Sequence, residues 1–182
     1  MKTKITIPDT DITIHPLGLG TVNAGLAWDE KETGRIIDTF LDMGGNLLDT
    51  AHVYSDWVKP ERARSERVIG DWLKRSGRRN QIVLATKGGH PDMTAANPDT
   101  HISRMKREDM INDLEGSLRQ LGTDWIDIYF YHRDDISQPV EELIEVMEKF
   151  CREGKIRYYA CSNWTTSRMR AADTYCREQG YR

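Results

Sequence analysis

The stretch QIVLATK, residues Gln81 to Lys87, contains an apolar run that leads directly to a lysine. A strand of a parallel sheet is buried on both faces, so its sequence is continuously apolar rather than alternating between apolar and polar residues. We therefore predict a buried strand that begins near Ile82 and belongs to a parallel sheet.

The sequence on both sides repeats the same pattern, a short apolar run followed by an amphipathic segment. Asp29 can cap the first predicted helix, and Gly122 suits the position just past a later one. Strands and helices that alternate with short connections predict parallel strands. The predicted elements are strands that begin near Leu17, Leu47, Ile82, Ile126 and Ile156, a preceding β-hairpin of residues 4–7 and 11–14, and a last helix from about Thr166 to Cys176.

The composition limits the classes of protein to which the chain can belong. The chain has 182 residues, of which 38% are hydrophobic and 30% charged, and its formal net charge is -3. These values fit one domain or part of a larger one, and they argue against a nucleic-acid or membrane-surface partner. No apolar run approaches a membrane span, and the three cysteines form no metal-binding pattern. We expect a cytoplasmic protein without a bound metal.

Polar residues stand at the carboxyl end of successive predicted strands. Asp49, Lys87 and His132 each close one strand, and Ser162 and Asn163 close the next. All carboxyl ends of a parallel sheet or barrel lie on one face, which is the face that binds ligands. The pattern therefore predicts that these residues, distant in sequence, converge on one site.

The residue types at this predicted site suit proton delivery to a carbonyl group. Asp49 can pair with Lys87, and the lysine charge favours the phenolate of Tyr54, which makes Tyr54 a better acid. A histidine beside that phenol, His132, can hydrogen-bond a carbonyl oxygen. The set lacks a hydride donor, so a nicotinamide cofactor is implied, and the hydroxyl and amide of Ser162–Asn163 could hold its carboxamide.

These residues lie in segments that resemble the aldo-keto reductases, a family of TIM-barrel enzymes. The similarity runs over nearly the whole chain. The segments are LGLGT (17–21), LLDTAHVY (47–54), SERVIG (65–70), ATKGG (85–89), LGTDWIDIYFYHRDD (121–135) and GKIRYYACSNW (154–164). The resemblance implies an α/β fold, a partial (β/α)8 TIM barrel of about five βα units after an N-terminal hairpin.

The resemblance also implies a role for each residue of the site. Tyr54 would be the general acid, tuned by Lys87 and Asp49, and His132 would orient the carbonyl of an aldehyde or ketone substrate. The cofactor would be NADP(H). Its site would be lined by Gly20, Thr21 and Val22, and its nicotinamide end would contact Asp49, Ser162 and Asn163.

Aromatic and histidine residues near the same face leave two interpretations open. Trp28, Trp57 and Trp164 suit aromatic walls around a substrate, but packing of loops onto the barrel rim explains each equally well. His52 and His90 are loop histidines, which are more often solvated than catalytic. The charged run KPERARSER, residues 59–67, is expected to be the solvated start of a helix.

The number of predicted strands raises the question of completeness. A barrel of this type needs eight strands and about 250 residues, whereas we count five strands. Residues 1–182 are therefore expected to be the N-terminal part of a single barrel whose later βα units are absent, in an enzyme of about twice this length. The other interpretation is a mature chain whose exposed barrel edges favour self-association. As a lone chain we expect weak cofactor binding and very low activity.

Two other functions remain possible from the sequence. Lys87 could form a Schiff base in a TIM-barrel lyase or isomerase, although pairing with Asp49 would keep it protonated. The chain could also be a non-enzymatic binding or regulatory protein on the reductase fold.

Overall fold

The predicted strands form one parallel sheet in the structure, a computed structural model that describes residues 4–58, 61–94 and 96–181. The strand order follows the chain, so each strand pairs with the next one in sequence. The sheet consists of β3 (Gly18–Gly20), β4 (Leu47–Asp49), β5 (Val83–Gly88), β6 (Ile126–Tyr131) and β7 (Ile156–Cys161). The predicted α/β architecture of five βα units is confirmed.

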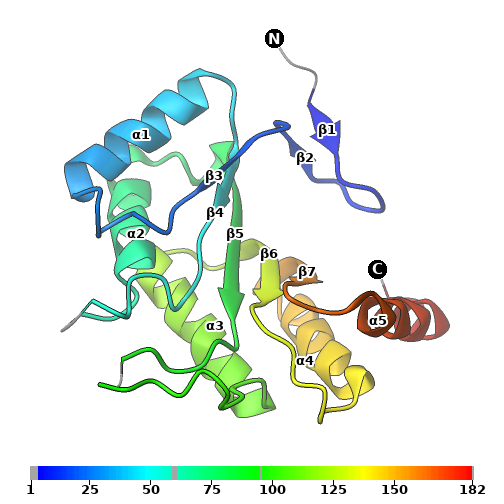
Figure 1. Ribbon diagram of the computed structural model, residues 1–182. Coiled ribbons are helices and arrows are strands. Elements are labelled where there is room, and N and C mark those ends of the chain that lie inside the picture. Colours follow the sequence, from blue (N-terminus) through cyan, green and yellow to red (C-terminus); the bar gives the residue numbers. More distant parts are fainter. Residues whose placement is uncertain (1–3, 59–60, 95, 182) are drawn as a thin grey trace.

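Helices alternate with these strands, as the sequence predicts. The Asp29 carboxylate caps the first helix by accepting a hydrogen bond from the Glu32 amide at 2.7 Å, and Gly122 ends the third with a φ of 62°. Figure 1 shows α1 and α2 beside β3, β4 and β5 and α4 beside β6 and β7, with the arrow of β5 pointing away from the hairpin. The helices are α1 (Glu30–Asp42), α2 (Arg64–Ser76), α3 (Arg107–Leu121), α4 (Val140–Arg152) and α5 (Thr166–Gln179), with a short 3-10 turn, η1 (Arg79–Gln81), before β5.

The N-terminal hairpin packs against the sheet face that the helices do not cover. Its strands, β1 (Ile5–Thr6) and β2 (Thr13–Ile14), are shorter than predicted because the turn occupies residues 8–11. Ile12 is 2% exposed and packs in one cluster with Val83 and Ile128. Burying a side chain of this size contributes about 1.5–3 kcal/mol, so the hairpin is anchored as a cover over the amino ends of the strands.

Polar contacts hold the hairpin to the last strand of the sheet. The Asp11 carboxylate accepts hydrogen bonds from Arg157 at 2.8 Å and from the Tyr158 hydroxyl at 2.9 Å. Arg157 also pairs at 2.7 Å with the buried carboxylate of Asp127, which pairs at 2.9 Å with Arg79. A buried carboxylate needs such partners, and this one links β6, β7, η1 and the hairpin.

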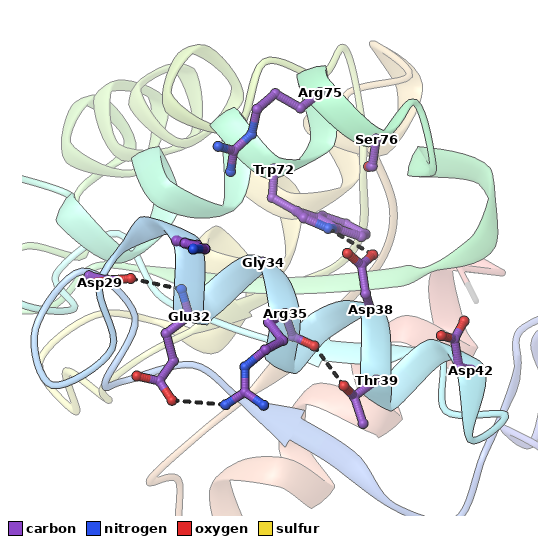
Figure 2. A pocket seen from close by; sticks show the side chains of 11 residues that line it. Asp29, Glu32, Gly34, Arg35, Asp38, Thr39, Asp42, Trp72, Arg75 and Ser76 are labelled. Atoms are coloured by element: carbon purple, nitrogen blue, oxygen red, sulfur yellow. Dashed lines mark hydrogen bonds and ion pairs between the residues drawn. The ribbon is translucent and has the colours of Figure 1, made fainter.

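Helices α1 and α2 pack beside an open groove on the outside of the molecule. The groove has a volume of about 830 Å³ and is lined by side chains of both helices. In Figure 2 the indole N–H of Trp72 points to Asp38, to which it donates a hydrogen bond of 3.1 Å. Asp49, Tyr54, Lys87 and His132 do not line this groove, so it is separate from the predicted site. Among the described residues, no helix has the length and apolar character needed to span a membrane.

Candidate active site

The sheet places the predicted catalytic residues at the carboxyl ends of neighbouring strands. Asp49 is the last residue of β4, Lys87 is the fifth residue of β5, and His132 directly follows β6. In the register of the sheet, Asp49 pairs with Gly20 on one side and with Ala85 on the other. The convergence expected from the sequence is therefore present in the structure.

The ammonium group of Lys87 joins two of the other three predicted catalytic residues. It donates to Asp49 Oδ1 at 2.7 Å, to the Thr50 carbonyl oxygen at 2.7 Å and to the Tyr54 hydroxyl at 3.3 Å. The side chain of Lys87 is only 9% exposed, whereas that of Asp49 is 37% exposed. A lysine ammonium has three N–H donors, so each of them has a partner here.

The loop after β4 carries Tyr54 to this position by continuing along β5. The Thr50 amide donates to the Ala85 carbonyl at 2.9 Å, and the His52 amide donates to the Lys87 carbonyl at 3.0 Å. The chain then turns, with Ser55 at a φ of 73°. These backbone hydrogen bonds of Thr50 and His52, a few residues before Tyr54, hold its phenol beside Lys87.

His132 lies beside the Tyr54 phenol as an uncharged imidazole. The two rings are 5.8 Å apart between centroids, in an edge-to-face arrangement. Burial, assisted by the nearby His90, Lys87 and Arg133, lowers the pKa of His132 to about 3. Because the ring stays neutral at physiological pH, it carries one N–H donor that can bond a carbonyl oxygen.

The two polar residues after β7 lie next to His132. Asn163 has a left-handed backbone, with a φ of 65°. Its side-chain N–H₂ donates to the His132 carbonyl at 2.8 Å and to the Ser162 hydroxyl oxygen at 3.0 Å. The Asn163 side-chain oxygen and the Ser162 O–H are the groups left to bond a carboxamide, which fits the donor and acceptor of a nicotinamide.

The last residue of β3 and the two that follow it differ in what they present at the edge of the sheet. Thr21 is fully buried, and its hydroxyl donates to the Asp49 carbonyl at 2.9 Å, so it ties β3 to β4. Val22 is 40% exposed. At Gly20, an added Cβ would meet no atom within 4 Å, which leaves open space beside Asp49.

The three tryptophans predicted at the substrate site have different surroundings. Trp164 stacks on Tyr131 at 5.9 Å and donates from its indole to the Arg133 carbonyl at 3.0 Å, so its packing role has direct support. Trp28 is half-buried, and its backbone N–H donates to the Asn23 carbonyl at 3.0 Å. Trp57 is 44% exposed.

A buried ionic cluster behind the site was not predicted from the sequence. Glu66 is fully buried, where it accepts a hydrogen bond of 2.7 Å from Thr86 and lies 3.2 Å from His52 Nδ1. The other ring nitrogen of His52 lies 4.0 Å from Asp113 Oδ1. His52, expected to be solvated, therefore sits between two carboxylates from α2 and α3.

Burial of Glu66 corrects the expectation for the run 59–67. Ala63, Ser65 and Glu66 are buried, so this helix start is solvated only in part, while residues 59 and 60 lie outside the described residues. The signal that could have indicated this is the spacing of Ser65, Glu66 and Ile69, which share the inner face of α2.

Comparisons with known proteins point to one family. A family model described as "Aldo/keto reductase family" matches residues 16–180. The chain is 31% identical to the aldo-keto reductase ausK of Aspergillus calidoustus, over 97% of this chain and 46% of that protein. It is 36% identical to the uncharacterized oxidoreductase YrpG of Bacillus subtilis, over 85% of this chain and 47% of that protein.

A solved structure of the same kind matches the fold. The holo form of the aldo-keto reductase AKR11C1 from Bacillus halodurans gives a TM-score of 0.77 at 33% identity, over 92% of this chain and 52% of that one. The partial TIM barrel is therefore confirmed as the fold class. The chain spans about half the length of the relatives it matches. Because the family model matches residues 16–180 and relatives such as ausK are aldo-keto reductases, the chain belongs to the aldo/keto reductase family.

Proposed function

We propose that this site reduces the carbonyl group of an aldehyde or ketone, or oxidises the corresponding alcohol, with Tyr54 as the proton donor and NADP(H) as the hydride carrier. The observation that carries the proposal is the hydrogen-bonded chain from Asp49 through Lys87 to the Tyr54 hydroxyl. A phenol in contact with a buried ammonium, at the ligand-binding edge of a parallel sheet, is suited to give up a proton.

Each residue of the site has a defined task in this proposal. The neutral imidazole of His132 donates a hydrogen bond to the carbonyl oxygen and holds it near the Tyr54 hydroxyl. Tyr54 then donates its proton to the oxygen as negative charge develops there. The ammonium of Lys87 stabilises the phenolate that remains, and the Asp49 carboxylate holds the ammonium in place by their 2.7 Å contact.

The residues around this chain of hydrogen bonds fit the nicotinamide end of the cofactor. NADPH supplies the hydride when it is bound. Ser162 and Asn163 would hold its carboxamide, and the open space at Gly20 would admit the ring beside Asp49. The choice of NADP(H) is supported by the aryl-alcohol dehydrogenase [NADP(+)] of Phanerodontia chrysosporium, which is 30% identical over 91% of this chain and 41% of that protein.

The geometry disfavours the alternative in which Lys87 forms a Schiff base. An amine must lose its proton to attack a carbonyl carbon, and Lys87 donates all three N–H groups while paired with a carboxylate. Borohydride trapping with a keto substrate should therefore label no lysine.

The test is an NADPH titration of the chain by cofactor fluorescence, followed by turnover of aromatic aldehydes. Replacing Tyr54 with Phe removes the proton donor and keeps the ring. We expect turnover to fall by about 10²–10⁴-fold while the affinity for NADPH is unchanged.

The matched control is Tyr175→Phe, which removes a hydroxyl that bonds Glu145 on the outer helices. This variant should keep the parent turnover. Retained turnover in Tyr54→Phe would exclude Tyr54 as the proton donor, and binding of NADH in preference to NADPH would contradict the proposed cofactor.

A further inference from the structure

The imidazole of His132 is placed by neighbouring rings rather than by hydrogen bonds of its own. Its Nδ1 atom is buried and has no hydrogen-bond partner among the described residues. Its backbone is fixed, since the amide donates to the Gly88 carbonyl at 2.8 Å and the carbonyl accepts from Asn163. The ring itself packs near two others, with centroid distances of 5.8 Å to Tyr54 and 4.8 Å to His90.

His90, in contrast, is anchored through both of its ring nitrogens. Its Nδ1 lies 2.9 Å from the Pro91 carbonyl oxygen, and its Nε2 lies 3.1 Å from an Arg133 guanidinium nitrogen. A carbonyl only accepts and a guanidinium only donates, so the ring carries its proton on Nδ1 and is neutral. Arg104 also donates to the His90 carbonyl at 3.3 Å. The His90 ring is thus held by its two nitrogens, with its centroid 4.8 Å from that of His132.

We propose that His90 is a positioning residue, whose anchored ring fixes the imidazole of His132 in the orientation that faces Tyr54 and the substrate carbonyl. This inference rests on the proposed function, because it assigns His90 to the carbonyl-binding step. In this proposal the Arg133 guanidinium acts on the site indirectly, by holding the His90 ring.

His90 also shields His132 from water on the side of a small polar cavity. The cavity has a volume of about 150 Å³ and is lined by His90 together with Lys87, His52 and Asp113. Removing the His90 ring would extend this cavity to His132 and admit water to its imidazole. The charged or titratable groups that face His132 are Lys87 from β5, His90 and Arg133 from the loops after β5 and β6, and Tyr54 from the loop after β4.

The test compares two substitutions of His90 by NMR titration of the histidine rings. In the parent chain His132 should show no titration between about pH 5 and pH 8, because burial holds its pKa at about 3. In His90→Ala, hydration of the ring should raise the midpoint of His132 to between about pH 5 and 6.5. His90→Phe restores a ring at this position without the anchors and should keep His132 neutral over most of this range.

Turnover of an aldehyde with NADPH provides the second measurement. We expect kcat/KM to fall about tenfold or more in His90→Ala, with partial recovery in His90→Phe. His101→Ala, which alters an exposed histidine of the same loop, should match the parent in both measurements.

The two measurements separate this inference from the proposed function. An unchanged titration of His132 in folded His90→Ala, with the fold verified by circular dichroism, would overturn the positioning role whatever the turnover. Retained turnover in Tyr54→Phe would overturn the proposed function, whereas the titration would still show whether His90 fixes His132.

Discussion

At the scale of single residues, the most unusual environment is that of the Glu66 carboxylate. It is fully buried, and its partners are the neutral hydroxyl of Thr86 and the imidazole of His52. Burial alone would lower the pKa of His52, but the hydrogen bond and charge of Glu66, with the charges of Asp113 and Asp56, outweigh it and raise that pKa. When it is protonated, His52 compensates the charge of Glu66 and ties the loop of Tyr54 to helices α2 and α3.

This pairing predicts a stability that depends on pH. The pKa of His52 is higher in the folded chain than its unfolded value of about 6.5, so its stabilising contribution is fully present below pH 6.5. The contribution is lost as pH rises through the folded pKa. We expect His52→Asn to lower the free energy of unfolding by about 1–3 kcal/mol at pH 5.5, and by less at pH 8.5.

Urea unfolding of the parent and the variant at several pH values measures this difference. His101→Asn is the matched control, since that side chain is exposed, and it should cost little at any pH. A destabilisation by His52→Asn that grows with pH would contradict the protonated pair.

The residues of the site differ in how far the sequence could reveal them. The positions of Asp49, Lys87 and His132 could be predicted because the strand ends fix where such side chains meet. The pair of Glu66 and His52 could not, because a glutamate among arginines near a helix start has the composition of a solvated surface. Its spacing in α2 can indicate that this glutamate faces inward, but only the folded structure shows that it meets Thr86 and His52.

At the scale of helices and strands, glycines set how closely the outer helices approach. Gly70 of α2 faces the end of α3, where an added Cβ would lie 2.1 Å from the Gln120 carbonyl oxygen. Gly34 of α1 faces Trp72, but there an added Cβ would lie 3.4 Å from the indole, an ordinary contact distance. Gly70 thus has no room for a methyl group, whereas Gly34 has enough.

Alanine substitutions at these two glycines should therefore have opposite effects. Gly70→Ala forces α2 away from the backbone of α3 and should lower the free energy of unfolding by about 1–3 kcal/mol. Gly34→Ala adds helix propensity without a clash and should raise it by about 0.5–1 kcal/mol. Chemical denaturation of both variants measures the effects, and a stable Gly70→Ala would show that α2 and α3 can separate without cost.

Element types were predicted more reliably than element boundaries. The apolar runs identify the five strands because burial on both faces leaves a strong compositional signal. The last helix extends to Gln179, three residues past the expected end at Cys176, and Gly180 follows it with a φ of 74°. No residue of α5 is fully buried, so little apolar periodicity marks where this helix ends.

At the scale of the whole molecule, the sheet has two outer strands. In the described part of the chain, β3 pairs only with β4, and β7 pairs only with β6. Unpaired strand edges offer backbone donors and acceptors to another chain.

Self-association through these edges is therefore expected for the isolated chain. Sedimentation velocity over a range of concentrations should show a mass that rises above that of the monomer. The variant Ile136→Lys, which removes a loop side chain that is 84% exposed, should associate like the parent. A monomer at every concentration, or association lost in Ile136→Lys, would contradict pairing at the strand edges.

The hairpin that covers the amino ends of the strands has a consequence for the order in which the molecule assembles. Neighbouring strands of the sheet are neighbours in sequence, so each can dock on the one before it as the chain emerges during synthesis. Asp11, however, finds its partners Arg157 and Tyr158 only 146 and 147 residues later. A segment made early in synthesis therefore forms these contacts late, only after β7 has joined β6.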